Sequence, residues 1–278
     1  MVQRQPAPRP LPKVTLGSSS VYPARLETAF EIAARLGYDG VEVMVLGDPD
    51  TQMAAPINAL AKQYGVPVLS IHAPTLLVTQ RVWGTSDPWE KIDKSIDLAF
   101  DTGCDTVVLH PPFRWQREYA RGFAEGVAKR ESDRNVVLAV ENMFPWRAGS
   151  AWMQVYLPGW NPVPQPFDNV TIDFSHAAIA HDDVLHMKAS LGARLRHIHL
   201  ADGTGSFKDE HLVPGRGSQP VAEFLHELGA EGFGGVIAAE VGTRKCTSEQ
   251  RDRDLTETLE FARRHLAAGA EAARQEKP

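Results

Sequence analysis

The strongest constraint on the fold is a regular alternation between short runs rich in β-branched residues and longer amphipathic stretches. The short runs are typical of β-strands, and the near-continuous apolar character of VVLAV and VIAA predicts strands that are covered on both faces. Segments of helical periodicity separate these runs, although the helical pattern after Glu141 is weak. We predict eight strands, at Val14–Gly17, Gly40–Val45, Pro67–His72, Thr106–His110, Val136–Glu141, Val170–Asp173, Leu195–Leu200 and Gly235–Glu240.

Eight strands that alternate with helices predict parallel pairing through right-handed crossovers, and such a repeat closes most economically into a barrel. An open doubly wound sheet is the alternative, but the chain has no glycine-rich GxGxxG turn to support it. We therefore predict a single α/β domain, a (β/α)₈ TIM barrel over residues 13–268, with a disordered proline-rich leader at 1–12 and a flexible tail at 269–278. The predicted helices are Leu26–Leu36, Met53–Tyr64, Trp89–Asp101, Glu118–Glu131, Asp182–Leu191, Pro220–Leu228 and Ser248–Leu266.

Composition and charge narrow the range of functions. The 278 residues carry a formal net charge of −6, so the chain has no overall basic field that would attract nucleic acid. No apolar run approaches the roughly 18 residues that a membrane span needs, and the leader lacks the apolar core of a signal peptide. Two cysteines suit a reducing compartment. We expect a cytoplasmic protein with a small-molecule substrate and no membrane partner. Nucleic acid is the less favoured partner, and a homo-oligomer is compatible with the sequence.

Imidazoles and carboxylates gather where six successive predicted strands end. In a parallel barrel the carboxyl ends of all strands open on one face, where the active sites of this architecture lie. Four imidazoles and three carboxylates facing one cavity would be costly if they were ionised and unpaired, and a bound divalent cation removes that cost. The strand ends supply His72, His110, Glu141, Asp173 together with His176, His199 and Glu240.

Two further polar residues lie within the predicted strands. His197 precedes His199 by two positions on the same strand face, so we expect it to point deeper into the barrel and leave it out of the site. Glu42 faces the same way as Met44. It is predicted either to reach the cavity or to form a buried ion pair with a neighbouring strand.

The loop after the seventh strand carries a second set of polar residues. Asp209 and His211 are spaced to act together over the rim of the barrel. The PGRG turn at 214–217 either presents backbone N–H groups to an anion or is an ordinary glycine-rich connection.

From about Val14 to the last helix, the chain resembles the xylose-isomerase-like TIM-barrel superfamily, which includes sugar phosphate isomerases and epimerases and the endonuclease IV group. The phrases GYDGVEVMV, IHAP, VLHPP, AVEN, IDFSH, HIHLAD and DEHLVPGRG carry the resemblance. The endonuclease IV group binds three zinc ions through nine ligands, whereas simpler isomerases and epimerases of the superfamily use one metal. The resemblance implies that the nine ligand positions are His72, His110, Glu141, Asp173, His176, His199, Asp209, His211 and Glu240, and that the single-metal set is Glu141, Asp173, His199 and Glu240.

The resemblance leaves two mechanisms open. Mixed nitrogen and oxygen ligands favour zinc, and the four-residue set would equally suit manganese or magnesium. In the isomerase hypothesis, the metal chelates the carbonyl and neighbouring hydroxyl of an open-chain ketose and stabilises the enediolate. Glu141 and Glu240 then remove and return the proton, while His176, His211 and Arg216 hold hydroxyls or phosphate. In the phosphodiesterase hypothesis, two or three zinc ions activate a hydroxide that attacks phosphorus, and Glu141 bridges metals or acts as the base.

The loops of the rim favour the isomerase. The segment Met143–Asp168 is long and rich in Pro, Trp and Tyr, which predicts an ordered lid-like loop after strand 5 or a dimer contact over the site. Arg114, beside Trp115, is the best substrate-binding candidate in the one local basic cluster. The rim lacks the wide set of Lys and Arg that a DNA-repair enzyme needs. We therefore predict a metal-dependent sugar or sugar phosphate isomerase or epimerase, with a trinuclear zinc phosphodiesterase of the endonuclease IV type as the alternative. A barrel that only binds sugar and has lost its chemistry would be expected to lack some of the metal-binding residues, and none of the nine is missing.

Overall fold

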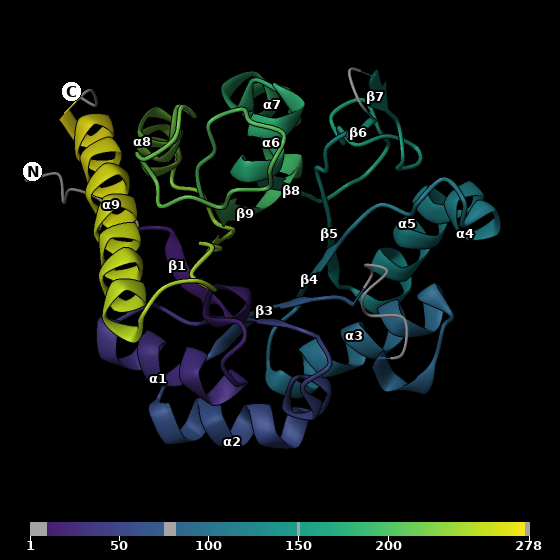
Figure 1. Ribbon diagram of the computed structural model, residues 1–278, viewed down its shortest axis with the longest axis horizontal. Coiled ribbons are helices and arrows are strands. Elements are labelled where there is room, and N and C mark those ends of the chain that lie inside the picture. Colours follow the sequence, from purple (N-terminus) through teal and green to yellow (C-terminus); the bar gives the residue numbers. More distant parts are fainter. Residues whose placement is uncertain (1–9, 75–81, 149–150, 276–278) are drawn as a thin grey trace, which may run out of the picture.

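A computed structural model describes residues 10–74, 82–148 and 151–275 and contains a closed barrel of eight parallel strands. Around the barrel the strands follow the order β1-β10-β9-β8-β5-β4-β3-β2 (Figure 1). The predicted (β/α)₈ TIM barrel is therefore confirmed. The barrel strands are β1 Lys13–Gly17, β2 Val41–Met44, β3 Val68–His72, β4 Thr106–Leu109, β5 Val137–Glu141, β8 Val170–Asp173, β9 Leu195–Leu200 and β10 Val236–Ala239.

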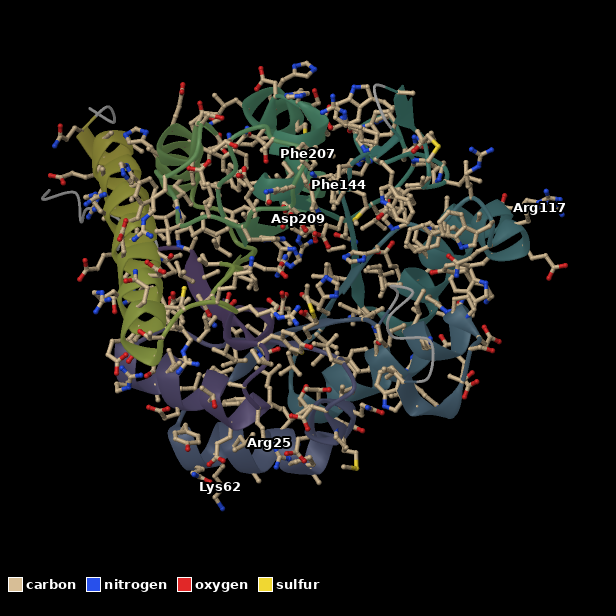
Figure 2. The ribbon with its side chains drawn as sticks, viewed as in Figure 1. Arg25, Lys62, Arg117, Phe144, Phe207 and Asp209 are labelled. Atoms are coloured by element: carbon tan, nitrogen blue, oxygen red, sulfur yellow. The ribbon has the colours of Figure 1, made fainter. Side chains whose placement is uncertain are left out.

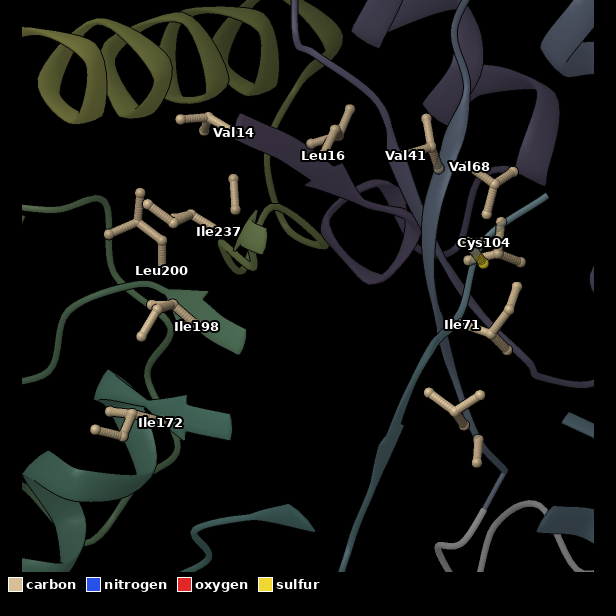
Figure 3. Packing of buried hydrophobic residues seen from close by; sticks show 14 of the residues in the cluster. Val14, Leu16, Val41, Val68, Ile71, Cys104, Ile172, Ile198, Leu200 and Ile237 are labelled. Atoms are coloured by element: carbon tan, nitrogen blue, oxygen red, sulfur yellow. The ribbon is translucent and has the colours of Figure 1, made fainter. Parts of the chain in front are cut away.

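The strands are buried on both faces, as their apolar runs predicted. On β1, Val14 and Leu16 point outward and are fully buried, as is Ile198 on β9 (Figure 3). The intervening inward positions are polar: Thr15 and His197 are also fully buried. Because side chains alternate along a strand, the outward set packs under the helices and the inward set is available to build a polar site inside the barrel.

Helices cover the outside of the barrel. The predicted helix 26–36 has the same bounds as α1, whereas the predicted 118–131 helix is two helices that meet at Gly122. The helices are α1 Leu26–Leu36, α2 Ala54–Tyr64, α3 Pro88–Thr102, α4 Arg117–Arg121, α5 Phe123–Arg134, α6 Phe174–Ala180, α7 Val184–Leu191, α8 Val221–Glu231 and α9 Ser248–Gln275.

The connection between β5 and β8 differs from a regular β/α unit. A two-stranded antiparallel hairpin, β6 Trp146–Ala148 and β7 Ala151–Met153, lies in the segment where the weak helical pattern was noted. Figure 1 shows this hairpin standing apart from the barrel strands. The described part of the segment therefore has an ordered hairpin, and its role as a lid or a dimer contact stays a prediction.

The last helix is longer than expected. The helix predicted to end at Leu266 continues to Gln275 as α9, so the segment 269–278 is helical up to that residue. The physical reason is close packing on α8: a Cβ on Gly229 would lie 2.0 Å from the Leu266 carbonyl oxygen, and one on Gly269 would lie 1.8 Å from the His226 carbonyl oxygen. Two glycines thus let the two helix backbones touch, which holds the segment in place. The predicted disordered leader covers residues 1–12, of which the structure describes only 10–12. None of the described helices is both long and apolar enough to cross a bilayer.

Candidate metal centre

The nine predicted ligands come together at the carboxyl end of the barrel. Strand ends or the residues directly after them provide most of the set, and the loop after β9 provides the rest. Figure 2 shows Asp209 pointing toward the middle of the ring of elements, whereas Arg117 points outward at its edge. The strands carry His72, Glu141, Asp173 and His199, the residues directly after β4 and β10 are His110 and Glu240, α6 carries His176, and the loop carries Asp209 and His211.

Glu141 is the hub of this cluster. Its Oε2 lies 2.9 Å from Nε2 of His110 and 3.3 Å from Nε2 of His72. Its Oε1 lies 3.0 Å from Nδ1 of His199 and 3.1 Å from Nδ1 of His176. Burial disfavours the charged carboxylate, but the surrounding imidazoles, with His199 and His110 first among them, hold the pKa of Glu141 well below its ordinary value. Glu141 is therefore an ionised carboxylate shared by four histidines.

Three carboxylates surround a single nitrogen of His199. Nδ1 of His199 lies 3.0 Å from Glu141, 3.0 Å from Glu240 and 3.6 Å from Asp173. Burial opposes the imidazolium, but Glu240, Glu141 and Glu42 outweigh it and raise the pKa of His199 well above its ordinary value. Three carboxyl groups thus converge on one ring nitrogen, which is a set of oxygen and nitrogen donors that a divalent cation could bind.

Asp173 provides a test of whether these residues fit a metal ion. Its Oδ1 accepts the backbone N–H of His176 at 2.7 Å, but its Oδ2 is buried and has no hydrogen-bond partner among the described residues. Burial raises the pKa of Asp173 despite the opposing influence of His176 and His211. A buried carboxylate oxygen without a donor is costly unless a cation binds it. The set Glu141, Asp173, His199 and Glu240 therefore fits a hard or borderline divalent ion.

A separate group forms around Asp209. Its Oδ1 lies 3.1 Å from Nε2 of His211, and its Oδ2 lies 3.5 Å from Nε2 of His176. Burial disfavours the protonated ring of His211, but Asp209 and Asp173 overcome this and raise its pKa to about 10. Ser175 fixes the group, because its Oγ donates to Asp209 at 2.7 Å and accepts the backbone N–H of His211 at 3.0 Å.

A second layer of polar residues supports the cluster from inside the barrel. Oε1 of Glu42 lies 3.0 Å from Nε2 of His199, and Oε2 lies 2.8 Å from Nε2 of His197 and accepts from Ser70 at 2.6 Å. Burial disfavours the charged form of Glu42, but the imidazoles of His197 and His199 outweigh this effect and hold the pKa of Glu42 well below its ordinary value. A carboxylate on the remote nitrogen of a metal-binding histidine fixes which nitrogen faces the metal.

Glu42 therefore resolves two alternatives left by the sequence. It reaches the interior of the barrel, where it pairs with β9 on the opposite side and also contacts the neighbouring β3. Sequence reasoning assigned no role to Ser70 or Ser175. The inward position of Glu42 two residues before Met44 was the only signal available for this layer.

Arg216 forms ion pairs with α9, and its predicted contact with a substrate stays a prediction. Its guanidinium lies 2.9 Å from Asp254 and 2.5 Å from Glu257 on α9. The PGRG turn explains this placement: the backbone N–H groups of Gly215 and Gly217 donate to the carboxylate of Asp202 at 2.9 and 3.0 Å. The anion that the turn binds is thus the chain's own side chain.

Arg114 and Trp115 also lie apart from the nine ligands. They line a surface cavity of about 800 Å³ whose lining includes none of the nine. The ring of Trp115 stacks on Phe113 with centroids 4.5 Å apart, and Phe113 in turn stacks on Tyr156 at 5.0 Å. Stacked aromatic rings therefore hold Trp115 at the outer edge of the rim, and a direct contact of either residue with a substrate at the cluster stays a prediction.

Comparison with known proteins identifies a family and several relatives of this chain. The profile of the family described as xylose isomerase-like TIM barrel matches residues 30–265. An uncharacterised protein of Mycobacterium tuberculosis is 46% identical over 278 residues, which cover 93% of this chain and 99% of the relative. Fructoselysine 3-epimerase of Shigella flexneri is 24% identical over 241 residues, which cover 78% of this chain and 86% of the enzyme.

Solved structures share the fold at low sequence identity. A D-tagatose 3-epimerase-like protein superposes with a TM-score of 0.65 at 22% identity, covering 92% of this chain and 100% of the other. The IolI protein, whose structure contains a bound zinc atom, superposes with a TM-score of 0.65 at 15% identity, covering 92% of this chain and 99% of the other.

Proposed function

Because the chain belongs to the xylose isomerase-like TIM-barrel family, we propose that it is a divalent-metal-dependent isomerase or epimerase that acts on a ketose. The observation that carries the proposal is the set of three carboxylates around Nδ1 of His199, at 3.0, 3.0 and 3.6 Å. Sugar epimerases among the relatives and structural neighbours, such as fructoselysine 3-epimerase, support the same class of reaction.

In this proposal the metal is held by Glu141, Asp173, His199 and Glu240. Zinc suits the mixed nitrogen and oxygen donors, and the zinc atom of the related IolI structure supports this choice. Manganese and magnesium suit three carboxylates equally well. Glu42 would keep the proton of His199 on Nε2, so that Nδ1 is left for the metal.

The bound metal would draw electron density from the carbonyl and adjacent hydroxyl of an open-chain ketose, which acidifies the α-proton and stabilises the enediolate. The protein's own groups then have to move that proton. Glu240 is better placed than Glu141, because its side chain is 13% exposed whereas that of Glu141 is 1% exposed and its two oxygens contact four imidazoles. We therefore assign proton transfer chiefly to Glu240, with His176 and His211 orienting substrate hydroxyls.

The proposal predicts exchange of a specific proton. Incubation of the metal-loaded protein with ketoses in deuterated water should place deuterium on the α-carbon, which mass spectrometry or proton NMR detects. The metal content of protein purified without chelator should be near one ion per chain. The reaction class is wrong if no ketose exchanges while the protein retains its metal.

A second candidate function is a zinc phosphodiesterase, and one observation favours it. The nine side chains form three groups: Glu141 with His72 and His110, the set around His199, and Asp209 with His176 and His211. Paired metals can stabilise both the attacking and the leaving oxygen of a phosphodiester. About three zinc ions per chain and cleavage of an oligonucleotide with an abasic site would select this candidate.

A further inference from the structure

A cavity of about 860 Å³ opens between the loops that follow β1 and β2. Both loops lie at the carboxyl end of the barrel, the end that carries the metal ligands. Apolar side chains make up much of its wall, among them Tyr22, Pro23, Met44 and Leu46. Tyr22 is 47% exposed, which is high for an aromatic ring and leaves part of its surface open to a ligand.

Met44 connects this cavity to the metal ligands. Glu42 points into the barrel, where it contacts His199, and Met44 is two residues further along the same strand face. Met44 is also the register partner of His72 on β3, whose ring contacts Glu141. Met44 is thus part of the cavity wall and a neighbour of a candidate metal ligand, which places the cavity on the β2 and β3 side of the cluster.

Several polar side chains of the cavity wall accept hydrogen bonds from the backbone of the wall itself. Ser18 accepts the backbone N–H of Met44 at 2.8 Å, and Thr51 accepts that of Leu46 at 3.1 Å. Asp48 accepts the backbone N–H of Asp50 at 3.2 Å. These oxygens are thus partly satisfied within the wall, and the apolar side chains of the rest of the lining favour an occupant that carries an apolar group.

Charge argues against a phosphate in this cavity. Arg25 is the cation among the lining residues, and its guanidinium lies 2.7 Å from Asp50 and 3.8 Å from Asp48. Its charge is thus matched by two carboxylates that would repel an anion. Arg244 is not in the lining and covers the ring of Tyr22, with its guanidinium 5.3 Å from the ring centroid. Figure 2 shows Arg25 on the outer side, away from Asp209.

We infer that the substrate is a ketose that carries an uncharged apolar or aromatic substituent, and that this cavity holds the substituent. The inference rests on the proposed function, since the sugar part must bind at the metal ligands. Ligand pockets of drug-sized molecules measure roughly 300–1,000 Å³, so the cavity suits a substituent larger than a single hydroxyl. A sugar phosphate would instead find a wall without an available cation among the described lining residues.

The test uses three sugars and two glycine variants. The sugars are D-fructose, 6-O-benzyl-D-fructose and D-fructose 6-phosphate, and isothermal titration of the metal-loaded protein measures their Kd. Gly47 lines the cavity and has no atom within 4 Å of a Cβ built on it, so Gly47→Phe adds bulk there without a clash. Gly234 has the same open surroundings but lines a cavity at the other end of the barrel, so Gly234→Phe is the matched control.

We expect the benzyl ether to bind at least ~10-fold more tightly than D-fructose, which corresponds to about 1.4 kcal/mol. Gly47→Phe should abolish this advantage, and Gly234→Phe should leave it unchanged. Tyr22→Ala removes a half-exposed ring from the cavity wall and should reduce the preference for the benzyl ether over D-fructose. This variant replaces Gly47→Phe in the test if Gly47→Phe does not fold. Equal or absent binding of the three sugars, tighter binding of the phosphate, or an advantage that survives in Gly47→Phe would overturn the inference.

The titration separates the inference from the proposed function. Deuterium exchange is measured with the same three sugars in the same proteins. If the benzyl ether binds as expected but no sugar exchanges its α-proton, the proposed reaction is wrong and the cavity assignment stands. If all three sugars exchange with equal kcat/KM and bind equally, the reaction stands and the cavity assignment is wrong.

Discussion

The change Glu42→Gln tests whether the buried layer beneath the cluster controls metal binding. The carboxylate of Glu42 meets three donors: His199 at 3.0 Å, His197 at 2.8 Å and Ser70 at 2.6 Å. An amide has one acceptor oxygen and one donor nitrogen, so at least one of these donors loses its partner or must change its proton position. If the amide nitrogen faces His199, the proton of that ring moves to Nδ1, the nitrogen that faces the three carboxylates.

The size of the effect follows from this arrangement. Loss of a group that orients a metal ligand typically lowers metal affinity about 10- to 100-fold, or about 1.4 to 2.7 kcal/mol. We expect a loss in that range, because Glu42 is 1% exposed and is therefore shielded from solvent that could take its place. Metal affinity should fall more than the stability of the folded protein, because glutamine keeps the volume of the side chain.

Competition with a chromophoric zinc chelator measures the affinity directly and does not depend on knowing the substrate. Glu131→Gln is the matched control: Glu131 is also partly buried and hydrogen-bonded, to the backbone of Leu138 and to Asn169, but it is not among the nine ligands or their partners. Glu131→Gln should bind zinc like the unchanged protein. The reasoning is refuted if Glu42→Gln folds and binds zinc within twofold of the unchanged protein.

Three further predictions concern the cluster and its loop. Glu240→Gln should abolish deuterium exchange while circular dichroism and the Tm of the metal-free protein stay nearly unchanged; substantial residual turnover would contradict its role in proton transfer. Asp202→Ala should lower the free energy of unfolding by at least ~2 kcal/mol, measured by urea denaturation, because the backbone N–H groups of Gly215 and Gly217 lose their buried acceptor. In the metal-free protein, the pKa of His211 is raised to about 10. The folded state therefore binds more protons than the unfolded state between about pH 6.5 and 10, and its stability should fall as pH rises through that window. His211→Ala should flatten this dependence, and an unchanged slope would show that another group titrates.

Much of the fold could be predicted because the strands are buried on both faces. Their runs of apolar, β-branched residues mark them without reference to the rest of the chain, and α1 begins and ends where its pattern predicts. The β5–β8 connection escaped prediction because a short hairpin such as Trp146–Met153 has neither a helical period nor a long apolar run. The length of α9 depends on Gly229 and Gly269, whose contact with the neighbouring helix is not visible in a single segment.

The site also has features that the sequence predicts and features that it does not. Convergence of the seven candidate ligands at the strand ends follows from their position in parallel strands, whereas Asp209 and His211 were implied by the family resemblance. The pairing of Glu42 with His199 joins residues 157 positions apart across the barrel interior, and it requires the closed barrel to be known. The ion pairs of Arg216 with Asp254 and Glu257 on α9 could not be predicted, because these partners lie about forty residues further along the chain. Side chains on loops therefore remain the least predictable part of such a site.

The division of ligands between strands and one loop has an evolutionary consequence. Six of the nine candidate ligands lie at the end of a barrel strand or directly after one, whereas Asp209 and His211 belong to a loop that is fastened by Asp202 and Ser175. Loops tolerate insertions and substitutions far better than barrel strands do. A descendant could therefore lose or regain this part of the cluster, and with it the capacity for additional metal ions, by changes in one connection. The barrel itself would not need to be rebuilt for its chemistry to diverge.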